Sequence, residues 1–229
     1  QLFDALINKV NLPRRSILLT FDDGYASYKD TMSLLQKELI PAIFFISLRG
    51  KKYWWDILSE LLLNNQVIKN PEYDKINNLL SELGHNFKIE KYLDSSLVDN
   101  LKNWDVTVRK FPFNRNRAYY LLAKEMEDTN HYENDKLVNK ISSLSNEKRD
   151  FSYLNENHLV EFHKIGCHTV NHYNLSKLSY GDQKKEIEIC KNDLNAKLGQ
   201  KIEVFAYPFG GKIHYNSDTL KIVKNNFNF

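Results

Sequence analysis

The sequence predicts an α/β fold: a distorted, incomplete (β/α) barrel of parallel strands wrapped by helices, with a largely helical insertion. Two observations carry this prediction. Apolar runs alternate with helical patterns near both ends of the chain, and a strand, a helix and a second strand in succession form a parallel sheet. Between residues 51 and 150 asparagine and lysine become frequent, and the apolar clusters favour helices. We therefore expect a single domain over residues 1–229 with an insertion at about 51–150.

The first strand is expected in the run Ile17–Phe21, which ends in Asp22, Asp23 and Gly24. An unbroken apolar run is typical of a strand buried on both faces. The carboxylates then emerge at its carboxyl end, where α/β barrels place their active sites. A solvated Asp-Gly turn is the alternative for an isolated pair of acids.

Apolar residues at helical spacing predict the next helix, which Pro41 ends. They are Tyr28, Met32, Leu35 and Leu39. Ala42–Ile46 is expected to be the next buried strand. In the insertion, Asn70–Pro71 and Leu83–Gly84 are expected breaks between helices. The tryptophans Trp54 and Trp55 open the insertion, and we expect them to pack in a core rather than to stack on a sugar.

The strand–helix pattern returns after the insertion. We expect a short helix with Asn155 as its N-cap, then a strand at Lys164–Cys167 and a helix closed by Gly199. That helix has one apolar face, formed by Ile187, Cys190, Leu194 and Leu198. A strand at Ile202–Tyr207 and a last helix are expected to follow. The last helix is marked by Leu220, Ile222 and Val223, and Phe227–Phe229 could begin a further strand.

The composition, with 42% hydrophobic and 27% charged residues, is ordinary for a globular protein. The formal net charge of +3 is too balanced to indicate a nucleic-acid partner. No apolar run approaches the roughly 20 residues needed to cross a membrane, and no leader is visible after Gln1. We expect a soluble chain, and its location stays open, with the cell envelope and secretion both compatible. Cys167 and Cys190 are expected to be small core residues.

Three short motifs follow predicted strands: Thr20–Gly24, His168–His172 and Tyr207–Gly210. They read Thr-Phe-Asp-Asp-Gly, His-Thr-Val-Asn-His and Tyr-Pro-Phe-Gly. In this order they resemble the motifs of the polysaccharide deacetylase family, which contains metal-dependent N-acetyl-sugar deacetylases related to chitin and peptidoglycan deacetylases. The resemblance covers about residues 14–50 and 150–226. It implies a barrel that continues beyond Phe229, so the C-terminal part of the barrel is expected to be missing from this chain.

His168 and His172 are candidate metal ligands, since side chains at i and i+4 on one helical turn converge. Two histidines and a carboxylate with one open position suit a hydrolytic zinc site, where the ion acidifies water and polarises a carbonyl. Chemistry alone does not choose between Asp22 and Asp23 as the carboxylate. The resemblance assigns Asp23 to one divalent ion, with zinc expected, and Asp22 to general base catalysis.

The resemblance gives the third motif a backbone role. The N–H of Phe209 would help bind the oxyanion of the substrate, in a turn fixed by Pro208 and preceded by Tyr207. The sequence departs from the family at Ala206, where an arginine often braces the base. No fourth motif is evident, and the general-acid histidine of the family would lie beyond Phe229.

The remaining histidines have no motif support, and His214 is interpreted as an exposed loop residue rather than a proton donor. The others are His85, His131, His158 and His163. The leading hypothesis is a metal-dependent hydrolase that removes acetyl groups from an N-acetylated sugar of a polysaccharide or glycolipid. The alternative is a catalytically weakened carbohydrate-binding protein that retains the fold and the metal site. A helical interaction protein built around the insertion would leave the motifs unexplained.

Overall fold

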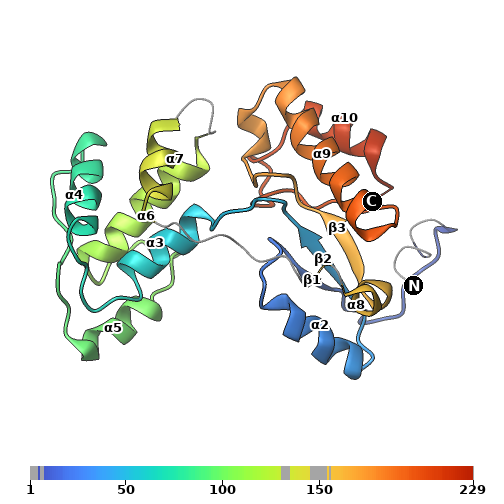
Figure 1. Cartoon of the computed structure of the whole chain (residues 1–229), viewed down its shortest axis with the longest axis horizontal. Helices are drawn as coiled ribbons and strands as arrows, with labels where there is room; N and C mark the ends of the chain where they lie inside the picture. Colours follow the sequence, from blue (N-terminus) through green and yellow to red (C-terminus); the bar gives the residue numbers. More distant parts are fainter. Residues whose placement is uncertain (1–4, 6–7, 130–134, 145–153, 155, 229) are drawn as a thin grey trace.

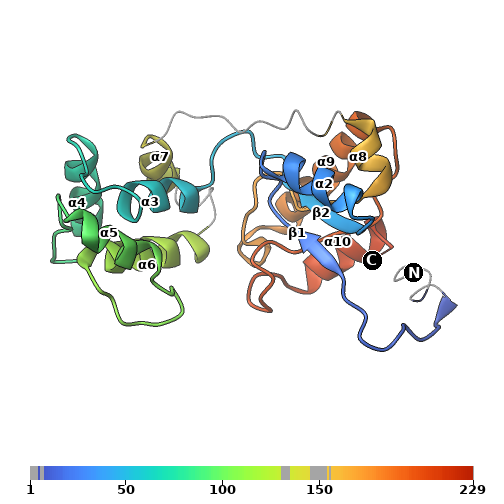
Figure 2. The same ribbon diagram turned by 90° about the horizontal axis from the view of Figure 1, so that it is seen from below.

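The structure is a computed structural model, and it describes residues 5, 8–129, 135–144, 154 and 156–228. Its elements form two groups that lie apart in both views of the ribbon (Figures 1 and 2). One group contains the sheet and the helices that precede and follow the insertion, and the other contains the helices of residues 54–142. In the described part of the chain, no helix combines the length and the apolar character needed to span a membrane.

Three strands form a parallel sheet in the order β1–β2–β3. β1 (Leu19–Phe21) pairs with β2 (Ala42–Ile46), which pairs with β3 (Lys164–Cys167) on its other side. In this register Phe21 lies opposite Phe44. The predicted α/β class and the parallel sheet are confirmed. The sheet formed by these three strands is open, so the barrel stays a prediction.

The prediction of a first strand buried on both faces is wrong. β1 starts only at Leu19, where pairing with β2 begins, and Ile17 and Leu18 are 86% and 47% exposed. Because the two residues precede the paired region, no neighbouring strand shields them. β1 is one end of the sheet, and its own residues are at most half-buried.

The strand predicted at Ile202–Tyr207 is reduced to a single parallel bridge between Cys167 and Phe205. The Cys167 N–H donates to the carbonyl of Val204 at 2.9 Å, and the Ala206 N–H donates to the carbonyl of Cys167 at 3.0 Å. β3 ends at Cys167, so only its last residue can pair with this segment. The segment still lies at the same edge of the sheet as the end of β3.

The helices outside the insertion pack around the sheet, with α9 and α8 against β3 and α10 against α9. They are α2 (Tyr28–Lys37), α8 (Asn157–Phe162), the short 3₁₀ helix η2 (Leu175–Lys177), α9 (Tyr180–Leu198) and α10 (Ser217–Asn226). The predicted end of α9 is confirmed, since Gly199 adopts φ of 61°, which glycine tolerates without strain. The predicted N-cap Asn155 lies outside the described residues, and α8 follows Glu156 instead.

The central strand β2 is buried on both faces, as predicted. Phe44 and Ile46 belong to the main core, together with apolar residues of α2, α8, α9 and α10. Phe45 lies in a smaller cluster with Val204 on the other face. Gly166 makes that cluster possible, because a Cβ at this position would lie 2.3 Å from a ring carbon of Phe45. Cys167 and Cys190 are buried free thiols, as expected of core residues.

The insertion is helical in its described residues, as predicted. Its helices are α3 (Trp54–Leu62), α4 (Glu72–Glu82), α5 (Ser95–Lys102), α6 (Asn114–Glu127) and α7 (Asp135–Ser142). Both predicted breaks are confirmed as the two ends of α4, which starts after Pro71 and stops before Leu83. These helices enclose a second apolar core, separate from the core around the sheet.

Arg115 organises the polar interior of the insertion and has no exposed surface. Its Nε donates to the carbonyl of Glu90 at 2.7 Å, its Nη2 to that of Gln66 at 3.2 Å, and its Nη1 to that of Asn65. The carboxylate of Glu90 in turn accepts from the N–H groups of Asn114 and Arg115 at the start of α6. One buried guanidinium therefore ties α6 to two preceding loops.

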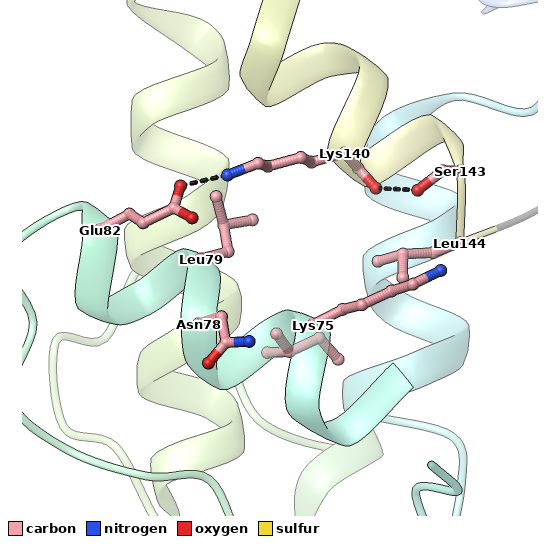
Figure 3. Close-up of a pocket in the computed structure, with 8 residues that line it drawn as sticks. Lys75, Asn78, Leu79, Glu82, Lys140, Ser143 and Leu144 are labelled. Carbon is pink, nitrogen blue, oxygen red and sulfur yellow. Dashed lines mark hydrogen bonds and ion pairs between the residues drawn. The ribbon is translucent and has the colours of Figure 1, made fainter. Parts of the chain in front are cut away.

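A cavity of about 230 Å³ lies between α4 and α7 in the insertion (Figure 3). Lys140 of α7 reaches across it to the carboxylate of Glu82 on α4. Lys75 and Leu79 of α4 and Leu144 line its walls. The ion pair joins the two helices, and the cavity is remote from the motif residues.

Candidate active site

The loops that follow the strands bring the three motifs together at the carboxyl edge of the sheet. Asp22 and Asp23 follow β1, and His168 and His172 follow β3. Tyr207–Phe209 follow the segment that is bridged to the end of β3. The chain also leaves this edge at the end of β2 to enter α3 (Figure 1). Parallel pairing thus places residues that are far apart in sequence in one region.

Asp23, His168 and His172 form the group with metal-ligand potential, and their candidate ligand atoms all lie within 4.8 Å of one another. Oδ1 of Asp23 is 3.2 Å from Nε2 of His172 and 3.6 Å from Nε2 of His168. Two ligands of one tetrahedral ion, with bonds of about 2.0–2.2 Å, are separated by roughly 3.4 Å. The donor set and its spacing therefore fit one zinc-like ion.

The surroundings of His168 prepare its ring to act as a ligand. The ring is 2% exposed, and its Nδ1 lies 2.8 Å from the carbonyl of Ala206. A carbonyl only accepts, so Nδ1 carries the proton and Nε2, on the side of Asp23, is left with its lone pair. Burial, followed by the neighbouring His172, lowers the pKa of His168 to about 4. The ring is therefore neutral near pH 7, which is the form that binds metal.

The loop between the two histidines is not the helical turn that their spacing predicts. No helix is present from His168 to His172, and Thr169 and His172 have φ of 65° and 59°. Oγ1 of Thr169 accepts from the His172 N–H at 3.0 Å. The two rings still approach to 4.8 Å between centroids. The side chains converge as expected, but a left-handed loop brings them together rather than a helix.

Asp22 lies beside this group, and its carboxyl has no hydrogen-bond or ion-pair partner among the described residues. The residue is exposed, and no described residue pairs with its side chain, whereas its backbone carbonyl accepts from the Tyr28 hydroxyl at 2.7 Å. Although Asp22 as a whole is exposed, it lines the cleft, and partial loss of hydration there is the main cause that raises its pKa. Repulsion from Asp23 raises the pKa further, and His172 lowers it. A raised pKa makes the carboxylate a better proton acceptor.

The loop Tyr207–Phe209 lies beside the same site. Phe209 has φ of 63°, a conformation that is strained for an aromatic residue and that clusters at functional sites in proteins. Its ring lies 4.7 Å from that of His172. Within the described residues, nothing accepts a hydrogen bond from the Phe209 N–H. The donor is therefore available to a ligand.

Aromatic residues at the start of the insertion support the metal group from the other side. The Tyr53 hydroxyl donates to the Asp23 carbonyl at 2.9 Å, and Tyr53 stacks on Trp55 at 4.1 Å between centroids. Trp55 meets the His172 ring edge-on at 4.8 Å and donates from Nε1 to the Tyr25 hydroxyl at 2.8 Å. Sequence reasoning missed Tyr53. The signal that could have identified Tyr53 is its position shortly after the carboxyl end of β2, at the edge of the sheet where the motif residues gather.

The motif residues open into a cleft of about 450 Å³. One part of its lining consists of Asp22, Asp23, His168, His172, Tyr207 and Phe209. Gly210 also lines it, and the insertion supplies the rest of the described wall, with Trp54, Trp55, Val106, Tyr119, Ala123 and Glu127. Burial is the main cause that raises the pKa of Tyr119 and of Glu127. Trp54 is 8% exposed and belongs to the insertion core, and the half-buried Trp55 packs against that core; both line the cleft.

A sequence profile of the polysaccharide deacetylase family matches residues 9–77 and 150–226. This match covers more than half of the chain. The chain belongs to the polysaccharide deacetylase family. The matched residues include Asp22, Asp23, both histidines of the metal group and Tyr207–Phe209, and residues 78–149 of the insertion fall outside the match. A search of curated protein sequences found no match.

Solved structures that resemble this polysaccharide deacetylase family member are distant in sequence. The deacetylase PplD of Streptococcus pyogenes, solved with acetate, is 17% identical, with a TM-score of 0.47 over 99% of this chain and 59% of that chain. IcaB from Ammonifex degensii is 18% identical, with a TM-score of 0.46 over 98% of this chain and 62% of that chain. The chain thus spans about three fifths of the length of these proteins.

Two positions named in the sequence analysis, Ala206 and His214, also lie near the site. The Ala206 carbonyl orients His168, but its methyl side chain offers no charge to brace Asp22. His214 is half-buried rather than exposed as predicted, because its ring packs 5.1 Å from that of Phe209. Burial lowers the pKa of His214. His214 does not line the cleft in the described structure.

The other histidines in the described part of the chain lie away from the metal group. His163 is buried, with Nε2 2.9 Å from the carbonyl of Met32, and His158 is exposed on α8. His85 lies in the insertion near Phe87. His131 is outside the described residues.

Proposed function

We propose that this chain is a metal-dependent hydrolase that removes acetyl groups from an N-acetylated sugar of a polysaccharide or glycolipid. The observation that carries the proposal is the convergence of Asp23, His168 and His172, with the ligand nitrogens of both rings directed at one carboxylate oxygen. Family membership supplies the deacetylase chemistry. The alternative, a carbohydrate-binding protein that retains the metal site, would share this donor set and differs from the proposal in its weakened catalysis.

In this proposal Asp23, His168 and His172 hold one divalent ion, with zinc expected. When bound, such an ion polarises the substrate carbonyl and lowers the pKa of water to about 7. Asp22 accepts the proton of the attacking water, for which its unpaired carboxylate and raised pKa are suited. The N–H of Phe209, in the turn of Tyr207 and Pro208, donates to the developing oxyanion. We assign no residue as the proton donor to the leaving amine.

We further propose that residues 1–229 are part of one barrel-like domain and that the insertion at about 51–150 forms a wall of its substrate cleft. The insertion supplies six lining residues, among them Tyr119 and Glu127. The hydroxyl of Tyr119 and the carboxyl of Glu127 can bind sugar hydroxyls, and the aromatic lining residues can pack against the apolar faces of sugars. The insertion would then determine which glycan binds.

Acetate release tests the proposed function. The purified chain is stripped of metal, reloaded with zinc, and incubated with a panel of N-acetylated oligosaccharides, including chitooligosaccharides. We expect acetate from at least one of them, only after reloading. Specific binding of an oligosaccharide without acetate release under any metal would instead support the carbohydrate-binding alternative. Acetate release that survives metal removal would contradict metal dependence.

A further inference from the structure

One side of the loop between His168 and His172 is held by the buried carboxylate of Glu186 on α9. Glu186 is 6% exposed. Its Oε2 accepts from the backbone N–H groups of Val170 at 3.1 Å and Asn171 at 2.7 Å. Its Oε1 accepts from Nδ2 of Asn171 at 2.7 Å. Both carboxylate oxygens are thus directed at residues that lie between the two candidate ligands.

The end of β2 holds the opposite side of the loop. The Ser47 hydroxyl donates to the Val170 carbonyl at 3.1 Å, and the Leu48 N–H donates to the Thr169 carbonyl at 3.2 Å. The left-handed conformations of Thr169 and His172 are strained for residues other than glycine and persist only where the surroundings enforce them. The hydrogen bonds to Glu186 hold the loop in these conformations from one side, and those of Ser47 and Leu48 hold it from the other.

The N–H groups of Val170 and Asn171 are partly buried, which explains why an acceptor is needed at this position. A backbone donor that is shielded from water and left without a partner destabilises the fold, and a charged acceptor forms stronger hydrogen bonds than a neutral one. Burial raises the pKa of Glu186, whereas the hydrogen bonds from Asn171 and Val170 and the charge of Arg49 favour the carboxylate. Without an acceptor here, the loop would have to turn both N–H groups toward solvent.

We propose that Glu186 is a positioning residue of the metal centre, which fixes the spacing of the His168 and His172 rings by holding the loop backbone and thereby sets the affinity for the ion. The inference rests on the metal centre of the proposed function but not on catalysis. Partners that orient metal ligands typically contribute about 10–100-fold to metal affinity. Glu186 acts on the backbone that carries both rings, whereas Ala206 orients only the ring of His168.

Two conservative variants separate positioning from simple charge attraction. In Glu186→Gln the amide oxygen still accepts from both backbone N–H groups, and Asn171 can turn its own amide to accept from the new NH₂ group. Glu186→Asp keeps the charge, but its side chain is one methylene shorter and cannot reach both N–H groups. Positioning therefore predicts affinity within about threefold of the native chain for Glu186→Gln and a loss of about 10–100-fold for Glu186→Asp. Attraction between charges predicts the reverse order.

The measurement is zinc affinity of the full chain by competition with a chromophoric chelator, together with the visible spectrum of the Co²⁺-loaded protein. Thermal unfolding in chelator confirms that each variant folds. Glu188→Asp is the matched control, since Glu188 lies on the same helix and contacts Asn226 rather than the loop. We expect this control to leave the affinity and the spectrum unchanged. A merely structural role of Glu186 would lower the melting temperature but leave both unchanged.

Asn171→Ala is a second variant, which removes only the Oε1 contact and which we expect to lower zinc affinity several-fold. If Glu186→Asp does not fold, this variant decides. Native affinity and spectrum in Glu186→Asp and Asn171→Ala would overturn the inference, as would a loss in Glu186→Gln greater than in Glu186→Asp. Because the readout is metal affinity, failure of acetate release in the native chain would contradict the proposed function and leave this inference standing.

Discussion

Replacing Asp22 or Asp23 with asparagine should affect different properties: the rate of acetate release for Asp22 and the metal content for Asp23. Asp22 is exposed, and no described residue pairs with its side chain, so Asp22→Asn should change the free energy of unfolding by less than about 0.5 kcal/mol. Its amide cannot accept a proton from water. General base catalysis contributes about 10²–10⁴-fold, or roughly 2.7–5.5 kcal/mol of barrier, so the rate should fall by that factor with zinc retained.

Asp23→Asn should act on the metal instead. Oδ1 of Asp23 lies 3.2 Å and 3.6 Å from the two imidazole nitrogens, and a neutral amide oxygen is a much weaker ligand at that position. Loss of an outer partner already costs about 10–100-fold in affinity, so loss of a direct ligand should cost more. We expect low zinc content and partial recovery of activity with added zinc.

The assay combines elemental analysis for zinc with acetate-release rates for both variants and the native chain. Zinc loss in Asp22→Asn with zinc retention in Asp23→Asn would reverse the two roles. Small effects of both substitutions on both measurements would mean that the Asp-Asp-Gly segment is a turn without chemistry, and the reasoning would be refuted.

Further predictions concern stability, pH and substrate choice. Arg115→Met removes three charge-assisted hydrogen bonds that the buried Arg115 donates to backbone carbonyls, and it should lower the free energy of unfolding by about 3 kcal/mol in urea denaturation; a loss below about 1 kcal/mol would contradict this. In the metal-free protein, the folded pKa of His168 is about 4, below the unfolded value near 6.5, so the unfolded state binds more protons between these values. Stability should therefore fall as pH drops from about 6.5 to 4, and His168→Gln should flatten that dependence. Glu127→Gln, at the insertion wall, should change relative kcat/KM values among oligosaccharides and leave zinc affinity unchanged; uniform activity on every substrate would favour an insertion used only for packing or dimerisation.

Local patterns were sufficient to predict the central elements of the fold. Ala42–Ile46 is an unbroken apolar run and needs burial on both faces, which only an inner strand provides. The apolar stripe that includes Ile187 and Leu194, followed by Gly199, was sufficient to predict the buried face of α9 and the point where it ends. His168, His172 and one of the two adjacent aspartates could be predicted as a group because their residue types and strand-end positions restrict the chemistry, whereas the choice of Asp23 over Asp22 came from the family resemblance.

The remaining features depend on contacts between distant segments. The exposure of Ile17 depends on where pairing with β2 begins, and an apolar run carries no such information. The i, i+4 spacing of the histidines is the same in a helix and in the loop that Glu186 stabilises. Tyr53 reaches the backbone of Asp23 from the start of the insertion, 30 residues away in sequence. Such hydrogen bonds are set by packing rather than by local preference.

The metal content of the purified chain tests the central claim most directly, namely that Asp23, His168 and His172 form one metal centre. We predict one zinc ion per native chain after reloading and dialysis, and none in the double variant His168→Ala/His172→Ala. Circular dichroism of the metal-free forms establishes that both chains are folded. Stoichiometric zinc retained by the folded double variant, or no metal bound by the native chain, would contradict the account.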